Sequence, residues 1–179
     1  MRILKYLHGT SSLGVTLKNE SLTPINIDVF ADASFAIHQS DRKSHSGLCI
    51  KIGSSTVLCK SGKQTLVTTS STEAELVACA DAIPYVEGIR KLLTELNFPI
   101  GSTIIHQDNL STIRLIQNKK PLSQRTLHID NKFFFLREKH QLGAVNIVHT
   151  STTSMLADLF TKPVNGQQFV YLRDQILNV

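Results

Sequence analysis

The sequence of 179 residues has no long hydrophobic run and no secretory signal. A membrane-spanning helix needs about 18 or more consecutive apolar residues, and no segment approaches that length. The first residues, Met-Arg-Ile-Leu-Lys-Tyr-Leu-His-Gly, lack the apolar centre and the small-residue cleavage site of a signal peptide. Internal repeats and low-complexity tracts are also absent. We therefore expect one domain of ordinary size with a short appendage, and no membrane partner.

Cysteine is scarce, because the chain contains only Cys49, Cys59 and Cys79. Their number is odd and they are far apart in the sequence, unlike the cysteines of a disulfide framework or a zinc cluster. The pattern predicts three buried thiols in a reducing, intracellular compartment. Apolar residues make up 41% of the chain, which is enough for a hydrophobic core. The formal net charge of +5 favours a polyanionic partner, although many ordinary proteins are equally basic.

The segment Ile25–Ser34 alternates apolar and polar residues, which predicts a β-strand. Its polar set ends with Asp32, and small residues follow. A carboxylate that is buried at the end of a strand loses hydration, and only a cationic partner offsets that loss. Asp32 is therefore the first candidate for a functional site.

The remaining pattern predicts an α/β layered domain. Strands at 48–52 and 56–60 follow the first strand after short turns, as in an antiparallel meander. A helix begins at Ser70, which can form a capping box with Glu73, and Pro84 is expected to kink this helix. We expect a five-stranded mixed sheet with helices on both faces. The other expected elements are an N-terminal helix that ends at Gly9, strands at 14–17, 102–106 and 145–149, and helices at 110–117, 125–142, 155–160 and 167–177.

Two aspartates lie at the ends of strands. Asp32 ends the first strand, and Asp108 follows the strand at 102–106 immediately before a helix. In open α/β sheets, functional sites form outside strand ends where neighbouring strands diverge. Two such carboxylates can share a Mg²⁺ or Mn²⁺ ion, which prefers oxygen ligands. The alternative is that Asp108 is only a turn residue or the N-cap of the next helix.

The helix that begins at Ser70 carries two glutamates near its start. Helical residues that are two apart differ by about 200° around the axis, so Glu73 and Glu75 cannot share a face. Glu75 lies on the face of Cys79, which is close to the apolar stripe, and is expected to point inward. Glu73 lies on the opposite face, toward solvent, and is expected to act as the cap. The competing interpretation is a second capping box between Thr72 and Glu75.

Three further features have both a functional and a structural interpretation. Asp158 lies in a short apolar helix and is either a ligand or a solvated helix residue. His149 ends the last strand and is either a proton shuttle or a surface histidine. The segment 111–140 is rich in positive charge and either follows a phosphate backbone or presents a solvated helix face above core phenylalanines. The basic residues of this segment are Arg114, Lys119, Lys120, Arg125, Lys132, Arg137 and Lys139.

Several short strings together match a known family, in the family's order and over roughly residues 24–178. The chain resembles the ribonuclease H domain of copia-type LTR retrotransposon Pol polyproteins. Residues 1–10 also resemble the segment that joins the reverse transcriptase to this domain. The expected organisation is a connection remnant at 1–23, the ribonuclease H-like domain at 24–162 and a C-terminal helical extension at 163–179. The matching strings are Phe30-Ala-Asp-Ala-Ser-Phe-Ala, Asp41-Arg-Lys-Ser-His-Ser-Gly, Lys63-Gln, Ser70-Ser-Thr-Glu-Ala-Glu-Leu, Gln107-Asp-Asn, Arg125-Thr-Leu-His-Ile-Asp, Arg137-Glu-Lys and Leu156-Ala-Asp-Leu-Phe-Thr-Lys-Pro.

The resemblance implies the ribonuclease H fold and an acidic tetrad of Asp32, Glu75, Asp108 and Asp158. It implies hydrolysis of the RNA strand of an RNA–DNA hybrid with two Mg²⁺ ions, for which Mn²⁺ can substitute, and Asp32 is expected to bridge them. The upstream reverse-transcriptase domain is the implied protein partner. The residues expected to contact nucleic acid are Ser34, Ser71, Asn109, Arg125 and His128.

The sequence also departs from the cellular members of this family. The loop that carries their catalytic histidine is short here, which weakens a role for His149, and their basic protrusion is absent. Pro84 is unexpected in the helix that carries Glu75. The alternative function is therefore an inactive or co-opted retroelement remnant that at most binds nucleic acid. A strand transferase with the same fold would need a different spacing of acids.

Overall fold

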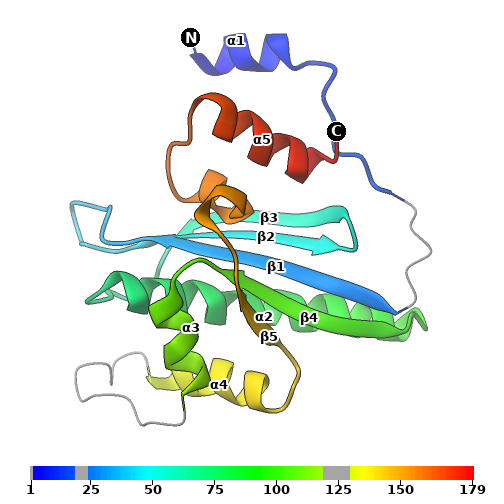
Figure 1. The fold of residues 1–179 in the computed structure, drawn as a ribbon. Helices are drawn as coiled ribbons and strands as arrows, with labels where there is room; N and C mark the ends of the chain where they lie inside the picture. Colours follow the sequence, from blue (N-terminus) through cyan, green and yellow to red (C-terminus); the bar gives the residue numbers. More distant parts are fainter. Residues whose placement is uncertain (1, 19–23, 119–129) are drawn as a thin grey trace.

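The computed structural model describes residues 2–18, 24–118 and 130–179, and its centre is a five-stranded sheet (Figure 1). The order across the sheet is β3-β2-β1-β4-β5. β2 is antiparallel to both β1 and β3, whereas β4 is parallel to β1 and β5 is parallel to β4. This confirms the predicted meander and the mixed sheet. The strands are β1 (Ile25–Ser34), β2 (His45–Ile52), β3 (Ser55–Lys63), β4 (Ile100–Gln107) and β5 (Asn146–His149).

Helices lie on both faces of the sheet, as predicted (Figure 1). One face carries α2 (Ser71–Glu95), α3 (Leu110–Gln117) and α4 (Asp130–Gln141). The other face carries the 3-10 helices η2 (Thr152–Ser154) and η3 (Leu156–Phe160) and helix α5 (Gly166–Leu177), with α1 (Arg2–Gly9) beyond α5. Among the described residues, no helix is long and apolar enough to cross a membrane.

The alternation within β1 separates two hydrophobic cores. Ile27, Val29 and Ala31 are fully buried in the main core, which also contains the apolar residues of α2. Phe30 points to the other face and packs in a second cluster with Cys49 of β2 and residues of η3 and α5. Asp32 belongs to the same alternating set as Phe30. The period of two thus delivers its carboxylate to the end of a sheet that is covered on both sides.

Helix α2 closes the main core and begins as predicted. Ser70 is its N-cap, and the Ser70 Oγ accepts a hydrogen bond from the backbone N–H of Glu73 at 3.2 Å. Pro84, at which a kink was expected, does not interrupt α2, which continues as one helix to Glu95. Ile83 and Val86 are buried on either side of the proline, so packing against the sheet holds the helix where one backbone donor is missing.

Two predicted elements differ from the structure, and a third lies partly outside the described residues. Residues 14–17 are not a strand. The segment lies beside the end of α5, where Thr16 N–H donates to the Leu177 carbonyl at 2.8 Å, and it is not paired with any strand of the described sheet. The helix expected at 155–160 is the short 3-10 helix η3, over Leu156–Phe160. The helix expected at 125–142 is described only from Asp130, as α4.

Candidate active site

Parallel pairing of β1 and β4 brings the ends of both strands to the same edge of the sheet. Asp32 lies near the end of β1, and Asp108 directly follows β4. Helix α2 starts at this edge and carries Glu75 in its second turn. One oxygen from each of Asp32, Glu75 and Asp108 lies within 4.8 Å of the others. The expected convergence of these three carboxylates is therefore present.

The cluster is largely shielded from water. Asp32 is 2% exposed and Glu75 is 6% exposed, whereas Asp108 is half-buried. Burial, together with the negative charge of Asp32, raises the pKa of Glu75 to about 9. A buried carboxyl group beside a carboxylate must either keep its proton or gain a cation. The geometry and the raised pKa both point to a cation site.

Gln107, the last residue of β4, organises this site from within the core and was not singled out from the sequence. It is fully buried, and its Nε2 donates to Glu75 Oε2 at 3.2 Å, to the Ala31 carbonyl at 3.3 Å and to Cys79 Sγ at 3.4 Å. Its Oε1 accepts from Asn109 N–H at 2.9 Å. Gln107 could have been recognised in the sequence as a long amide side chain at an inward-facing position of the strand, directly before Asp108.

Asp108 does not cap the following helix, so the N-cap alternative is wrong. The N-cap of α3 is Asn109, whose Oδ1 accepts from the backbone N–H groups of Ser111 and Thr112. The Asp108 carboxylate instead accepts a hydrogen bond from the Thr152 hydroxyl at 2.9 Å. The hydrogen bond from Thr152, in the segment after β5, therefore orients the Asp108 carboxylate.

Helix η3 brings Asp158 to the same edge from the other face of the sheet. Asp158 is 4% exposed, and Lys162 Nζ lies 2.9 Å from its Oδ1 and 3.9 Å from Asp32 Oδ2. The Thr161 hydroxyl donates to the same Asp32 oxygen. Burial raises the pKa of Asp158 to about 6, against the lowering effect of its bond to Lys162. Asp158 therefore lies beside Asp32, and the lysine ammonium joins the two.

The sequence did not single out Thr161 or Lys162. Both follow Asp158 at the three- and four-residue spacings that bring side chains together on a helical turn. That spacing, inside the string Asp158-Leu-Phe-Thr-Lys, is the signal that marks them.

Glu73 is not on the solvent side, and that part of the prediction is wrong. The residue is only 3% exposed, and its carboxylate accepts from Thr69 N–H at 2.6 Å and from the Thr69 hydroxyl at 2.8 Å. The side chain folds back over the start of α2, where backbone donors lack helical partners. Glu73 acts at the cap, as expected, but by covering the helix end. Glu75 is the acid that reaches the cluster, as the helix geometry predicted.

The residues expected to contact nucleic acid differ in their exposure and in their internal hydrogen bonds. Ser71 is exposed at the start of α2. The Ser34 hydroxyl donates to the Thr161 carbonyl at 3.0 Å, and Asn109 caps α3. His149 is exposed at the end of β5, beside Gln107 in the strand register. Arg125 and His128 lie outside the described residues.

Two lysines of the basic segment form ion pairs within the protein. Lys132 pairs with Asp81 and Lys139 pairs with Glu87, which ties α4 to α2. Phe133 is fully buried between these elements. For these positions the structure favours a charged helix face above a core phenylalanine over a phosphate-binding surface.

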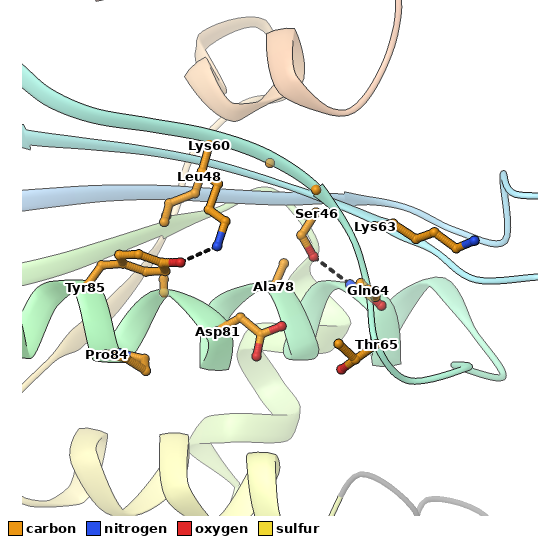
Figure 2. A pocket seen from close by; sticks show the side chains of 13 residues that line it. Ser46, Leu48, Lys60, Lys63, Gln64, Thr65, Ala78, Asp81, Pro84 and Tyr85 are labelled. Atoms are coloured by element: carbon orange, nitrogen blue, oxygen red, sulfur yellow. Dashed lines mark hydrogen bonds between the residues drawn. The ribbon is translucent and has the colours of Figure 1, made fainter.

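A cavity of about 320 Å³ lies between α2 and the strands β2 and β3 (Figure 2). At its wall, Lys60 Nζ donates to the Tyr85 hydroxyl, and Gln64 Nε2 donates to Ser46 Oγ at 2.8 Å. Its lining includes none of the acids of the cluster. The acid cluster is a site at the open edge of the sheet, apart from this cavity.

Sequence comparison finds similar segments in proteins of mobile elements. The chain is 34% identical over 169 residues to the retrovirus-related Pol polyprotein from transposon RE1 of Arabidopsis thaliana, covering 94% of this chain and 11% of that protein. It is 28% identical over 174 residues to the corresponding polyprotein from transposon TNT 1-94 of Nicotiana tabacum, covering 97% of this chain and 13% of that protein. The chain is homologous, over nearly its whole length, to one segment of the Pol polyproteins of copia-type retrotransposons. It spans about a tenth of the length of these Pol relatives, and no protein-family model matches it.

Solved structures agree with the fold that the Pol resemblance implies. The N-terminal ribonuclease H domain of a Mycobacterium tuberculosis protein superposes with a TM-score of 0.57 at 8% identity, covering 76% of this chain and 91% of that one. LC11 ribonuclease H1, solved in complex with an RNA/DNA hybrid, superposes with a TM-score of 0.52 at 15% identity, covering 75% and 92%. The chain has the ribonuclease H fold, as predicted from its motifs.

Proposed function

We propose that this chain is a metal-dependent endonuclease domain that hydrolyses the RNA strand of RNA–DNA hybrids during reverse transcription of a retroelement. The observation that carries the proposal is the meeting of Asp32, Glu75 and Asp108, whose ligand oxygens lie within 4.8 Å of one another. The Pol relatives and the ribonuclease H fold support the same function. The hybrid bound to LC11 ribonuclease H1 supports the substrate class.

The donor set fits a hard divalent cation. All the ligand atoms are carboxylate oxygens, which Mg²⁺ and Mn²⁺ prefer. Asp32 and Glu75 are both buried, so a cation would offset the burial and the repulsion by Asp32 that together raise the pKa of Glu75. We propose that these two residues and Asp108 hold the ion, with Asp158 completing the set beside Asp32. Such an ion, when bound, lowers the pKa of a coordinated water and stabilises negative charge on the phosphate.

The neighbouring side chains hold the carboxylates in place before substrate arrives. Gln107 fixes Glu75, and Thr152 fixes Asp108. Thr161 donates to Asp32. Groups that are already oriented need little reorganisation when charge develops in the transition state, which is the main source of electrostatic catalysis. We propose positioning roles for these residues in hydrolysis.

Recognition of the hybrid would depend on its backbone. RNA differs from DNA in its 2′-hydroxyl groups, which donate and accept hydrogen bonds. Ser71 is the best-placed candidate of the described residues, because it is exposed at the start of the helix that carries Glu75. Ser34 and Asn109 are less suited, since their side chains already make internal hydrogen bonds. Contacts from Arg125 and His128, and a proton-carrying role for the exposed His149, remain sequence-based proposals.

The proposed protein partner is the reverse-transcriptase part of the same polyprotein. Its support is the match to one segment of long Pol relatives. A fusion of the reverse transcriptase of the same element to this chain should bind hybrid more tightly than the chain alone, because two linked sites on one substrate increase the effective concentration.

The deciding experiment uses the purified chain and an RNA–DNA hybrid with a labelled RNA strand. We expect cleavage with Mg²⁺ or Mn²⁺ and none with a chelator, and no cleavage of duplex DNA. The Asp32→Asn variant should lower the rate by at least about 100-fold. Circular dichroism establishes that both proteins are folded. A folded wild-type chain that leaves the hybrid intact with both metals would overturn the proposal and favour a non-catalytic remnant.

A further inference from the structure

Lys162 lies beside two carboxylates of the candidate site, Asp158 and Asp32. Its Nζ is 2.9 Å from Asp158 Oδ1 and 3.9 Å from Asp32 Oδ2. An additional cation beside Asp158 and Asp32 would therefore compete with this ammonium. The ammonium thus already supplies positive charge there, and it does so from the residue four positions after Asp158.

The Asp32 carboxylate takes part in two groups of contacts. The Oδ2 atom accepts from the Thr161 hydroxyl and faces Lys162. The carboxylate also contributes a ligand oxygen to the group with Glu75 and Asp108. Among the described residues, the ammonium of Lys162 therefore contacts the cluster at Asp158 and Asp32, and the ion pairs place it within 4.0 Å of neither Glu75 nor Asp108.

We propose that Lys162 is a built-in counter-ion that makes the two metal positions unequal. One divalent ion binds tightly at Asp32, Glu75 and Asp108, and a second binds beside Asp158 only when the lysine moves away. This inference rests on the proposed function. It differs from a model with two equivalent ions, because the two ions bind in a fixed order and with different affinities. The Lys162 side chain is 39% exposed, so it can leave toward solvent without unfolding η3. A phosphate of the substrate can receive it there.

Metal binding to the intact chain tests this directly, without relying on cleavage. Titration with Mn²⁺, followed by calorimetry and electron paramagnetic resonance, reports both the affinity and the number of ions. For the wild type we expect one tight site and a much weaker second one. Lys162→Gln should strengthen the second site by at least about tenfold and produce the spin-coupled signal of a manganese pair. Lys162→Arg should restore the wild-type pattern.

The matched control is Lys91→Gln, at a lysine whose side chain is 79% exposed on α2 and pairs only loosely with Glu95. It should change neither site. Two equal sites in the wild type, unaffected by Lys162→Gln, would overturn the inference even if the chain cleaves hybrid. Failure of every variant to bind Mn²⁺ would instead overturn the proposed function and this inference together.

An independent observation concerns two of the three cysteines. Cys49 of β2 and Cys59 of β3 are directly opposed in the antiparallel register, and their Sγ atoms are 3.9 Å apart. Cys49 is buried under η3 and α5, whereas Cys59 is exposed on the edge strand, contrary to the expectation of three buried thiols. Directly opposed residues in such a pair have Cα atoms about 4.5–5.5 Å apart, which falls within the range that a disulfide spans.

The structure assigns Cys49 and Cys59 as a site of reversible oxidation to an intrachain disulfide by a peroxide. The Cys59 thiolate attacks the peroxide O–O bond, which gives a sulfenic acid and releases water. The Cys49 sulfur then displaces a second water from it. Overall, two thiols and one hydrogen peroxide become a disulfide and two waters. In support, the hydrogen bond between the two thiols lowers the pKa of Cys59 below its usual value, which favours Cys59 as the attacking group.

Peroxide treatment of the folded chain, followed by thiol titration in denaturant, tests this assignment. We expect two of the three thiols to be lost, a mass decrease of two hydrogen atoms, recovery with dithiothreitol and a higher melting temperature in the oxidised form. Peptide mapping should join Cys49 to Cys59 and leave Cys79, which is fully buried, as a free thiol. Cys59→Ser should abolish thiol loss. Stable sulfinic acid at Cys59, or a dimer linked through it, would overturn the assignment.

Discussion

Gly47 of β2 lies directly opposite Asp32 of β1 in the antiparallel register. A Cβ atom at Gly47 would lie 2.6 Å from the Ala157 carbonyl oxygen and 2.7 Å from Thr161 Cγ2. The missing side chain therefore lets the segment around η3 approach the sheet at the position of Asp32. This close approach is what brings Asp158, Thr161 and Lys162 to the acid cluster.

Gly47→Ala should push η3 away from the sheet and separate Asp158 from Asp32. We expect a loss of hybrid cleavage of at least about tenfold with a destabilisation of about 1–3 kcal/mol, the usual cost of overpacking. Cleavage rates and urea unfolding measure the two effects. The control is Gly62→Ala on β3, where a new Cβ meets nothing within 4 Å. Equal activity in the two alanine variants would contradict the role given to Gly47.

The pKa of Glu75 predicts how stability depends on pH in metal-free buffer. In the native state the pKa is about 9, against an ordinary value of 4.5, so between these values the native state holds a proton that the unfolded chain has lost. The stabilisation from this proton is full below pH 4.5 and falls as the pH rises toward 9, by up to about 1.4 kcal/mol per pH unit. Urea midpoints measured across this range report the slope.

Glu75→Gln removes the titrating group but keeps the shape and the partner Gln107. The variant should therefore show a flatter dependence of stability on pH than the wild type. Added Mg²⁺ should also flatten the wild-type curve at high pH, because the ion binds the ionised carboxylate of the native state. Parallel curves for wild type and variant would show that Glu75 is not protonated in the native state.

Gln107→Leu tests the buried amide that orients Glu75. The change leaves the Ala31 carbonyl and the Asn109 N–H without their partner, which should cost about 2–4 kcal/mol of unfolding free energy. It also removes a hydrogen bond to Glu75, so the affinity for Mn²⁺ should fall by about 10–100-fold. Gln141→Leu, at an exposed position at the end of α4, is the matched control and should change both quantities little. A normal metal affinity in Gln107→Leu would rule out the orienting role.

The sequence was sufficient for the features that depend on local periodicity. The alternation in Ile25–Ser34 identified β1 and the face of Asp32, and the helical angle between Glu73 and Glu75 identified the inward acid. Glu73 was misplaced because its side chain folds back onto Thr69, a local contact that a helical projection does not represent. Asp158 was predicted as a site residue from the family resemblance, because periodicity alone did not distinguish a ligand from a solvated helix residue.

Features that depend on register between distant segments could not be predicted from the sequence. The contact of Gly47 with the segment around η3 joins positions more than a hundred residues apart. The meeting of Cys49 and Cys59 requires the pairing of β2 with β3, which places one cysteine directly opposite the other. Lys162 reaches Asp32 only because η3 packs on the sheet. Each of these contacts is a consequence of tertiary packing, and no spacing in the sequence encodes it.

The ion pairs between α4 and α2 predict that Lys132 and Lys139 serve stability more than nucleic-acid binding. Each charge already faces an acid, Asp81 or Glu87, so neutralising these lysines should leave the salt dependence of hybrid binding nearly unchanged. The pairs are partly exposed, and a double-mutant cycle of Lys132→Gln with Asp81→Asn should give a coupling of about 0.5 kcal/mol. Arg114, exposed on α3, is the comparison, and Arg114→Gln should reduce the salt slope if the hybrid follows this side of the domain. A reduced salt slope in Lys132→Gln, without any coupling to Asp81, would instead place the lysine on the nucleic-acid surface.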